Sequence, residues 1–467
     1  MEATTLDFEN SAHAALENAA LQSALAKIKT GWVANRARAA DRLPEFEALR
    51  DLGRDIKNQS LAFLDLYLQA FEAKVTERGG TVHWARDAAE ARAVVLELCQ
   101  AAGARSVTKS KSMVTEEIGL TAFLESHGLE PTETDLGEYI LQISGQPPSH
   151  IVGPVVHMTK DDISEVFAKH HGGPRLEQAS DLVAEARRIL RQRYLAADVG
   201  ITGANFLIAE TGSAITVTNE GNAELTQGLP HTHIVVATLE KIVPTVEDAF
   251  TLLRLLARSA TGQEFSTYTT VMTGPKRTGD LDGPDRFHVV LLDNGRTQML
   301  GNELREMLRC IRCGACMNHC PVYLATGGHA YGWVYPGPMG SVLTPQLIGI
   351  EKGWPLPNAS TFCGRCQEVC PVRIPLPKLM RHWREEHFNR GLAPPAARWG
   401  LSVWGWFARR PWVYRLASRL AVIGLRLLGR SGRLRWAPLA RGWTATRDLP
   451  APQGGTFMSQ WRARGHR

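Results

Sequence analysis

The chain has 467 residues, a length that predicts at least two domains, and its 44% hydrophobic and 21% charged content is typical of a soluble globular protein. It has no apolar run of about eighteen residues, as a membrane span would need, and its first residues, MEATTLDFEN, lack the basic and apolar segments of a secretory signal. The net charge of +6 is uneven, because residues 391–467 hold fourteen Arg, no Lys and a single acidic residue, which leaves residues 1–390 at −7. A partner attracted by positive charge would therefore meet the C-terminal segment.

The first two thirds of the chain predict helices followed by an α/β domain. Apolar residues at helical spacing predict helices at residues 12–30 and 43–78. The predicted strands are residues 81–85, 105–110, 205–209, 213–219, 233–239, 267–272 and 286–293, and the helices predicted among them are residues 87–102 and 245–259. This alternation predicts βαβ units and a mostly parallel sheet, so we expect an N-terminal helical segment at residues 1–70 and an α/β domain at residues 71–295.

Seven of the eight cysteines lie between residues 310 and 370, and clustered thiols without a secretion signal favour metal ligation over disulfides. The first group has the C-x2-C-x2-C-x3-C-P spacing of bacterial ferredoxins, in which the last thiolate binds the other cluster. Its members are Cys310, Cys313, Cys316 and Cys320. A pair of zinc sites is the alternative, but zinc is commonly held by two C-x2–4-C pairs, which this run fits poorly. His319, beside the last thiol, is expected to lie near the cluster or at the surface rather than to bind metal.

The second group lacks one thiol, because Ser360 stands where the first cysteine of the run would be. Its members are Cys363, Cys366 and Cys370, again followed by proline. Crossed ligation then assigns Cys310, Cys313, Cys316 and Cys370 to cluster 1, and Cys320, Cys363 and Cys366 to cluster 2. A site with three thiolates can hold a [3Fe–4S] cluster, or a [4Fe–4S] cluster whose fourth ligand is Ser360, water or a residue of a partner subunit.

Residues 300–390 are therefore expected to form a two-cluster ferredoxin-type domain that passes single electrons from a donor to an acceptor. No G-x-G-x-x-G sequence follows any predicted strand, so the chain shows no NAD or flavin site of its own. A cluster module fused to a large domain favours the electron-relay subunit of an oxidoreductase complex.

Several segments together resemble the lactate utilization protein B family. They are residues 109–119, 201–213, 219–222, 310–321 and 363–377, within a resemblance that covers about residues 10–440. The resemblance implies an α/β domain related to the ribose-phosphate-isomerase and CoA-transferase folds, followed by an α-helical dicluster ferredoxin-like domain and a basic C-terminal extension. It also implies two [4Fe–4S] clusters in an electron-transfer subunit of a multi-protein system that oxidises L-lactate to pyruvate and allows growth on lactate.

Two other functions fit parts of the sequence. The clusters suit an iron–sulfur subunit of another 2-hydroxy-acid or glycerol-phosphate oxidoreductase equally well. Alternatively, the α/β domain is itself a CoA-transferase- or isomerase-like enzyme with structural or redox-sensing clusters. In the favoured interpretation the chain is a non-catalytic or co-catalytic subunit, cytoplasmic or peripheral on the inner face of the membrane, with the other subunits of the complex as its partners.

Polar residues at predicted strand ends and glycine-rich turns are candidates for binding a substrate, because ligands of open α/β sheets bind at such ends, and Lys109 and Lys111 could hold a carboxylate such as lactate or pyruvate. They are Lys109, Lys111, Glu210, Thr211, Asn219, Glu220 and Asn222. The alternative is that they cap helices and complete turns. His157, His231 and His233 are candidate proton acceptors, with a structural role as the alternative, and the sequence identifies no catalytic residue.

The C-terminal extension, residues 391–467, is rich in arginine and tryptophan. Its tryptophans are Trp399, Trp404, Trp406, Trp412, Trp436, Trp443 and Trp461. A helical pattern over residues 399–428 mixes Arg with apolar residues, which suits docking on partner subunits or on anionic lipid. Packing over the acidic body of the protein is the alternative, and nucleic-acid binding is disfavoured because no binding motif accompanies the charge.

Overall fold

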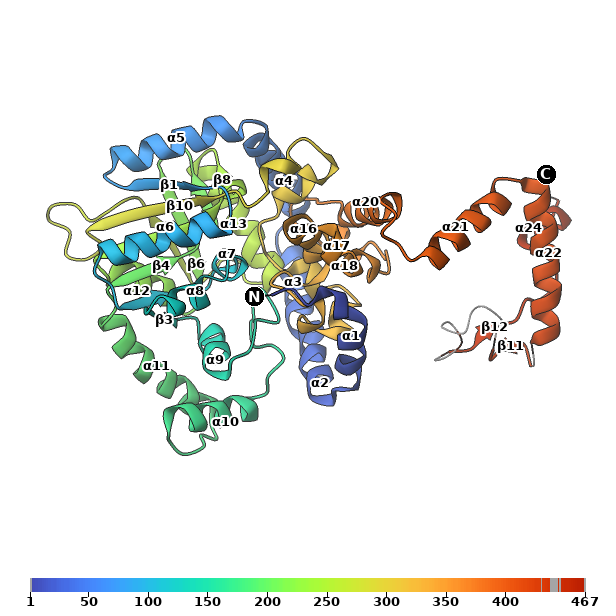
Figure 1. Cartoon of the computed structure of the whole chain (residues 1–467), viewed down its shortest axis with the longest axis horizontal. Coiled ribbons are helices and arrows are strands. Elements are labelled where there is room, and N and C mark those ends of the chain that lie inside the picture. Colours follow the sequence, from blue (N-terminus) through green and yellow to red (C-terminus); the bar gives the residue numbers. More distant parts are fainter. Residues whose placement is uncertain (1, 430, 437–443, 445–446, 466–467) are drawn as a thin grey trace. The chain divides into compact units, whose positions relative to one another are not determined.

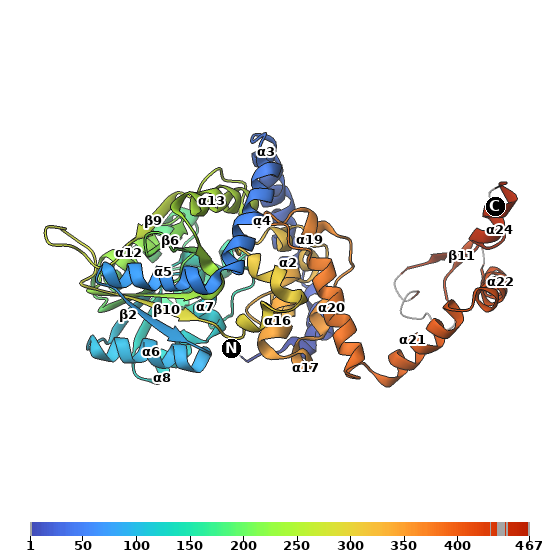
Figure 2. The ribbon, with the colours of Figure 1, turned by 90° about the horizontal axis from the view of Figure 1, so that it is seen from above.

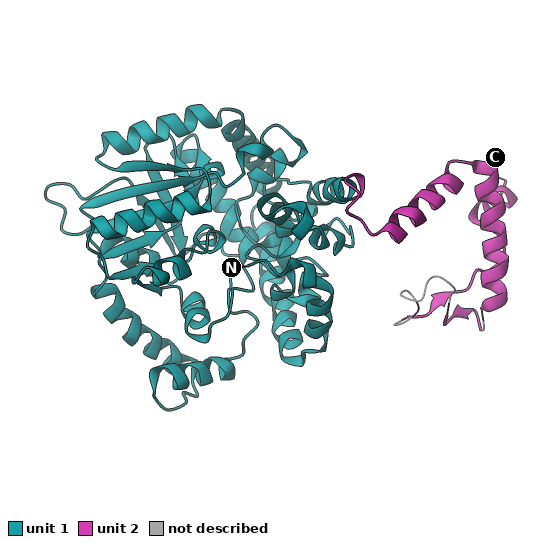
Figure 3. Cartoon of the chain, in the orientation of Figure 1, with its two compact units in different colours: residues 1–387 teal, residues 388–467 magenta. Residues whose placement is uncertain are grey.

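The structure is a computed structural model that describes residues 2–429, 431–436, 444 and 447–465 (Figure 1). It divides into two compact units, Met1–His387 and Phe388–Arg467 (Figure 3). The first unit holds every strand predicted from the sequence and all eight cysteines.

Helices form the N-terminal segment. They are α1 (Phe8–Glu17), α2 (Ala19–Ile28), α3 (Ala34–Asp41), α4 (Phe46–Ala62) and α5 (Leu64–Glu77), with short turns at Thr5–Asp7 and Lys29–Val33. The long helix expected at residues 43–78 is thus two helices, because Phe63 leaves the helical conformation with φ −124° and ψ 37°.

A six-stranded parallel sheet forms the centre of the α/β domain, which confirms the expected parallel sheet. Its strand order is β1 (Thr81–Ala85), β10 (Arg286–Leu292), β7 (Thr232–Thr238), β4 (Val199–Thr202), β2 (Ser106–Lys109) and β3 (Glu130–Glu133). The sequence did not predict β3 or β4. β3 reads Glu-Pro-Thr-Glu, without a β-type pattern, and such a sequence is tolerated because β3 lies at the sheet edge.

Successive residues of β7 pack on opposite faces of this sheet, as the two-residue period of a strand requires. Ile234 and Val236 pack with α6 (Ala88–Ala101) and α8 (Leu120–Ser126), whereas Val235 and Ala237 pack toward α5 and a second sheet. Figure 2 shows α5 on one side of β10 and α6 with α8 on the other. The central strands are therefore buried on both faces.

The second sheet is four-stranded and mixed, with the order β8 (Ile242–Val243), β5 (Phe206–Ile208), β6 (Ser213–Thr218) and β9 (Tyr268–Met272). β5 pairs with β6 antiparallel because the short turn between them, residues 209–212, cannot make a parallel crossover. Gly212 in that turn has a φ of +69°, and a Cβ there would lie 2.6 Å from the backbone nitrogen of Val75. The strands predicted at 205–209, 213–219 and 267–272 thus lie outside the parallel sheet.

Helices complete the α/β domain. They are α7 (Met113–Glu117), α9 (Leu136–Ser144), α10 (Lys160–His171), α11 (Ala179–Leu195), α12 (Asn222–Gly228) and α13 (Val246–Ala260), and a 3-10 turn, η3 (Leu239–Lys241), follows β7.

The cysteine-bearing region consists of short helices and turns. They are η4 (Thr297–Met299), η5 (Glu303–Arg309), α14 (Ala315–Asn318), α15 (Tyr323–Thr326), η6 (His329–Tyr331), α16 (Gly337–Ile348), α17 (Ile350–Gly353), α18 (Pro355–Asn358), α19 (Arg365–Glu368) and α20 (Leu376–Asn389). Their apolar residues share one continuous core with α2, α4 and α13. The region is therefore packed into the body of the first unit.

The second unit contains α21 (Pro395–Ala408), α22 (Pro411–Leu428), the two-residue strands β11 (Arg433–Leu434) and β12 (Leu449–Pro450), and α24 (Phe457–Ala463). The single helical pattern over residues 399–428 is two helices, because the residue before Pro411 is extended. Within this unit no side chain of α21 or α22 is buried. Trp443 lies outside the described residues. Among the residues that the structure describes, no helix is long and apolar enough to cross a membrane.

A buried ionic network joins the α/β domain to the cysteine-bearing region. Arg296, 1% exposed, donates two hydrogen bonds to the Glu117 carboxylate, at 2.9 and 2.7 Å, and forms an ion pair with Glu240 at 3.1 Å. Tyr335 donates to Glu117 at 2.6 Å, and Arg312 pairs with Glu240 at 3.2 Å. Burial alone would raise the pKa of Glu240, but Arg296 and Arg312 hold it down at about 2. The carboxylates and guanidinium groups of the network are therefore ionised, and among the described residues Arg296 is the one cation that pairs with Glu117.

We expect Arg296→Gln to lower the free energy of unfolding by about 3–5 kcal/mol, because it leaves the buried Glu117 carboxylate without a cation and Glu240 with Arg312 alone. Arg296→Lys should restore only part of the loss, since a lysine cannot make the paired hydrogen bonds of a guanidinium. Urea unfolding of anaerobically purified protein measures both. The exposed Arg277→Gln serves as control, with a change within about 0.5 kcal/mol. An equal effect of Arg296→Gln and Arg277→Gln would contradict the assigned role of the network.

Candidate metal centre and the adjoining cavity

Four of the seven clustered thiols line one buried cavity. Cys310, Cys313 and Cys316 come from the loop between η5 and α14, and Cys370 comes from the residues after α19. The other lining residues are almost all apolar, among them Ile151, Met307, Met339 and Val372. The loop turns tightly enough to aim three thiols at one point because Arg312 and Gly314 have φ of +60° and +76°.

Hydrogen bonds hold the fourth thiol in place. The amide of Ile374 donates to Cys370 Sγ at 3.3 Å, and Arg50 of α4 donates to the Cys370 carbonyl at 2.9 and 3.2 Å. Arg36 donates to the Val369 carbonyl at 3.0 Å. N-terminal helices more than three hundred residues away along the chain therefore position this cysteine.

The donor set fits an iron–sulfur cluster. Burial raises the pKa of the Cys313 thiol to about 12 and also raises the pKa values of Cys316 and Cys370. Cys313, Cys316 and Cys370 therefore become thiolates only with a cationic metal beside them, and an all-sulfur donor set in apolar surroundings suits iron–sulfur clusters. The thiols around this cavity are therefore the ones that the ferredoxin-type cysteine spacing assigns to cluster 1.

The other three thiols form a second group. Cys320 and Cys366 both interact electrostatically with Cys363, and Cys366 interacts in the same way with Cys316 of the first group. The Tyr331 hydroxyl lies close to Cys320. The two groups are therefore neighbours, and Cys363 is the exposed member.

Two neighbours of the second group have partners in the backbone. Ser360 Oγ accepts a hydrogen bond from the Phe362 amide at 3.2 Å. The ring of His319 donates from Nδ1 to the Ala315 carbonyl at 2.9 Å.

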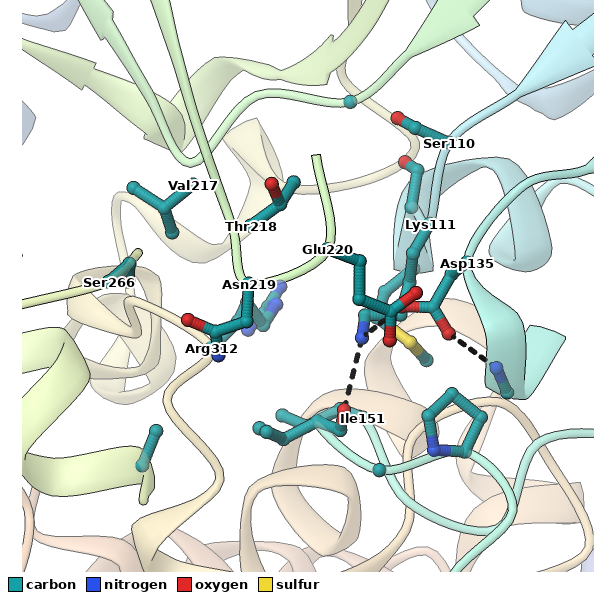
Figure 4. A pocket seen from close by; sticks show the side chains of 18 of the residues that line it. Ser110, Lys111, Asp135, Ile151, Val217, Thr218, Asn219, Glu220, Ser266 and Arg312 are labelled. Atoms are coloured by element: carbon teal, nitrogen blue, oxygen red, sulfur yellow. Dashed lines mark hydrogen bonds and ion pairs between the residues drawn. The ribbon is translucent and has the colours of Figure 1, made fainter. Parts of the chain in front are cut away.

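A second, larger cavity lies at the carboxyl ends of the parallel strands (Figure 4). Of the seven polar residues selected from the sequence, Lys111, Asn219, Glu220 and Asn222 line it. Lys111 donates to Asp135 at 2.9 Å and to the Val152 carbonyl at 3.0 Å, and Lys111, Asp135 and Glu220 point toward one another in Figure 4.

Among the lining residues that the sequence did not place at this cavity are Lys241, Arg312 and Cys313, the last of which was predicted only as a cluster ligand. Lys241 follows β7, and Arg312 and Cys313 belong to the first cysteine motif. Lys241 is 6% exposed, and burial, with Arg312 nearby, lowers its pKa to about 8. Because Cys313 lines this cavity and the thiol cavity alike, the two are adjacent. Asn219 was selected because it lies at the end of a predicted strand, and the same criterion could have selected Lys241. No sequence pattern around Arg312 indicates that its side chain lines this cavity.

The other three selected residues lie elsewhere. Glu210 accepts a hydrogen bond from the Val246 amide at 3.0 Å and so caps α13, and Thr211 donates to Ser213 at 2.7 Å within its turn. Lys109 is fully buried and forms ion pairs with Glu116 and Glu133, both at 3.0 Å.

Two family models match the chain, the LUD domain at residues 68–292 and the 4Fe-4S dicluster domain at residues 306–374. The chain is 42% identical to lactate utilization protein B of Anoxybacillus flavithermus, over 100% of this chain and 99% of that relative. It is 44% identical to lactate utilization protein B of Geobacillus sp. (strain WCH70), over 96% of this chain and 95% of that relative. The chain belongs to the lactate utilization protein B family. A solved DUF162 family protein from Deinococcus radiodurans matches 49% of this chain and 98% of its own, at 17% identity and a TM-score of 0.29.

The LUD domain of this family member holds the three histidines selected from the sequence, and none of them lines the larger cavity within the described residues. His233 is buried in β7 and makes a hydrogen bond with Thr202 at 2.8 Å, and burial lowers its pKa to about 3. His157 makes a hydrogen bond with Ser149 at 2.9 Å, and His231 forms an exposed pair with Asp285 at 2.6 Å. All three have structural partners.

An acidic group surrounds Lys109 at a third cavity. Carboxylate oxygens of Glu116, Glu133 and Glu138 lie within 4.8 Å of one another. Glu138 is 4% exposed, and neither of its carboxylate oxygens has a hydrogen-bond partner among the described residues. Burial raises the pKa of Glu138 well above its usual value; Lys109 opposes this shift and Glu133 adds to it.

The raised pKa predicts how Glu138 affects stability. Unfolded chains lose the Glu138 proton near pH 4.3, whereas the folded protein keeps it to higher pH, so the wild type loses stability as the pH rises above about 4.3. We therefore expect Glu138→Gln to raise the melting temperature more at pH 8 than at pH 5, because a glutamine side chain cannot ionise. Thermal unfolding with a chelator present measures this, and Glu125→Gln, at an exposed position of the same cavity, should show no such difference. Equal shifts of Glu138→Gln at both pH values would show that Glu138 is not held protonated.

Proposed function

We propose that this chain is the iron–sulfur electron-transfer subunit of a multi-protein system that oxidises L-lactate to pyruvate and supports growth on lactate. The observation that carries the proposal is the gathering of seven thiols in two neighbouring groups, four of them around one buried cavity. The 4Fe-4S dicluster match and the names of the full-length relatives support it. The relation of the α/β domain to the ribose-phosphate-isomerase and CoA-transferase folds belongs to the same proposal.

Two [4Fe–4S] clusters are proposed, one held by Cys310, Cys313, Cys316 and Cys370 and one by Cys320, Cys363 and Cys366. When bound, such clusters supply one-electron transfer. The chain's own residues bind and position them: Ile374 donates to Cys370 Sγ, and Arg50 holds the Cys370 carbonyl. The nearness of Cys366 to Cys316, which act on each other electrostatically, supports a short path from one group to the other.

Growth on lactate tests the proposed function. We expect deletion of the gene to abolish growth on L-lactate as sole carbon source but not on pyruvate, and the wild-type gene to restore it. A gene carrying Cys310→Ser should not restore growth, because the variant loses a ligand of the first cluster, whereas Cys99→Ser, at the buried cysteine of α6, serves as the matched control. Undiminished growth of the deletion strain on L-lactate would refute the proposal.

The two clusters should differ in their stability toward oxygen. Anaerobically purified protein should contain about seven to eight iron ions with matching sulfide. We expect the second cluster to lose iron first on exposure to air, since one of its irons lacks a thiolate, and to give a [3Fe–4S] signal in low-temperature EPR.

Substitutions separate the two centres. Cys363→Ser should remove the oxygen-labile signal and Cys316→Ser the stable one, while Ser360→Cys should suppress the [3Fe–4S] signal. Equal lability of the two clusters, or a colourless protein with stoichiometric zinc after anaerobic reconstitution, would contradict the proposed ligand sets.

The C-terminal extension is proposed to dock this subunit on its partner subunits. Removal of residues 390–467 should keep the cluster absorbance and abolish co-purification with those subunits. High salt should release the wild-type protein, because screening shortens the reach of exposed charges from about 8 Å at physiological ionic strength to about 3 Å at 1 M. Loss of the clusters on truncation would instead make the extension a structural part of the protein, and retention on anionic vesicles would make its target a membrane.

A further inference from the structure

The cavity at the carboxyl ends of the parallel strands has two walls from distant parts of the first unit. One wall is formed by residues that follow β2, β3, β4 and β7, among them Lys111, Asp135 and Lys241. The other contains Arg312 and Cys313 of the first cysteine motif. The cavity measures about 460 Å³, a size at which proteins hold small molecules.

The cations of this cavity are not all neutralised by the protein. Lys111 is paired with Asp135 at 2.9 Å, and Arg312 with Glu240 at 3.2 Å. Lys241, although nine-tenths buried, has no hydrogen bond and no ion pair within 4.0 Å to any described residue. Glu240 and Cys310 act on Lys241 only from beyond ion-pair distance, so its ammonium group can pair with an anion bound in the cavity.

The remaining lining suits an organic molecule rather than a bare ion. Hydroxyl and amide groups of Ser112, Thr218, Asn219 and Asn222 lie beside apolar groups such as Val217. Glu220 contributes a carboxylate that can accept a hydrogen bond from a ligand hydroxyl, and burial, followed by Asp135, raises its pKa. The lining therefore combines cations for a carboxylate with partners for a second polar group.

We propose that this cavity binds a small organic carboxylate of the 2-hydroxy- or 2-oxo-acid class, with its anionic group held by Lys241 and Arg312 beside Cys313. The anion site follows from the protein residues alone. The choice of acid class rests on the proposed function. Because Cys313 lines both cavities, the bound acid lies against a proposed ligand of the first cluster.

Lys57 has a different role from Lys241. It is 1% exposed, donates to the backbone carbonyls of Glu240 and Ile242, and does not line the cavity. Lys241, in contrast, lines the cavity and donates to no backbone carbonyl among the described residues. The competing explanation is that Lys241 only balances the negative charge of the first cluster.

Isothermal titration of the anaerobically purified holoprotein tests the proposal, with L-lactate, pyruvate, acetate and inorganic phosphate as probes. We expect one saturable site for L-lactate or pyruvate, weaker binding of acetate, which lacks the second polar group, and no binding of phosphate at that site. Lys241→Met should weaken binding about tenfold or more, since a charge-assisted hydrogen bond is lost, and Lys241→Arg should restore part of it. Lys352→Met, at an exposed lysine of α17, should leave the affinity unchanged.

The possible outcomes separate a failure of the binding-site proposal from a failure of the proposed function. Absence of saturable carboxylate binding by the wild type, or equal affinity of Lys241→Met and the wild type, would overturn the proposal. A Lys241→Met variant that shifts the cluster reduction potential while no acid binds the wild type would assign Lys241 to the cluster alone and overturn it too. Tighter binding of phosphate would overturn the carboxylate assignment. Carboxylate binding by a protein that takes up no iron on anaerobic reconstitution would uphold the anion site and refute the proposed function.

Discussion

The contact on which the arrangement of the first unit depends is the buried pairing of Arg296 with Glu117 and Glu240. Arg296 directly precedes η4, Glu117 belongs to α7 and Glu240 belongs to η3. All three elements lie at the carboxyl edge of the parallel sheet. Tyr335 and Arg312 of the cysteine-bearing region complete the network from the other side. Charges removed from water tolerate only a narrow set of geometries, so the network holds the sheet edge and the first cysteine motif in one alignment.

That alignment has consequences for the thiols. Arg312 lies between Ile311 and Cys313 of the motif, and its guanidinium lies over the Tyr335 ring, 5.1 Å from the ring centre. The same residue pairs with Glu240 while its backbone takes a positive φ within the metal loop. A single arginine thus links the shape of the thiol loop to the strand ends where the larger cavity opens. The ion pair of the Arg312 side chain and the positive φ of its backbone therefore both fix the position of this one residue.

The cysteine-bearing region also depends on the N-terminal helices. Arg50 and Arg36 hold the backbone before and at Cys370, and apolar residues of α2 and α4 share a core with the short helices that carry the thiols. Short helices of four residues bury little surface alone, so this shared core is what stabilises them. A fused ferredoxin-type module of this kind is held in place by the rest of the chain.

The sequence by itself determined what local spacing can encode. Short stretches of sequence were enough to predict the two main domain types. The cysteine runs predicted the dicluster domain, and the alternation of strands and helices, together with the family segments, predicted the α/β domain. The sequence also placed Lys111, Asn219, Glu220 and Asn222 at strand ends, where the cavity was found. Only the tertiary structure decided that Lys109 is buried among carboxylates, that residues 205–219 form a hairpin outside the parallel sheet, and that Lys241 and Arg312 share a cavity with Cys313. Those facts depend on packing between residues up to two hundred positions apart in the chain, and no local pattern of residue types specifies such contacts.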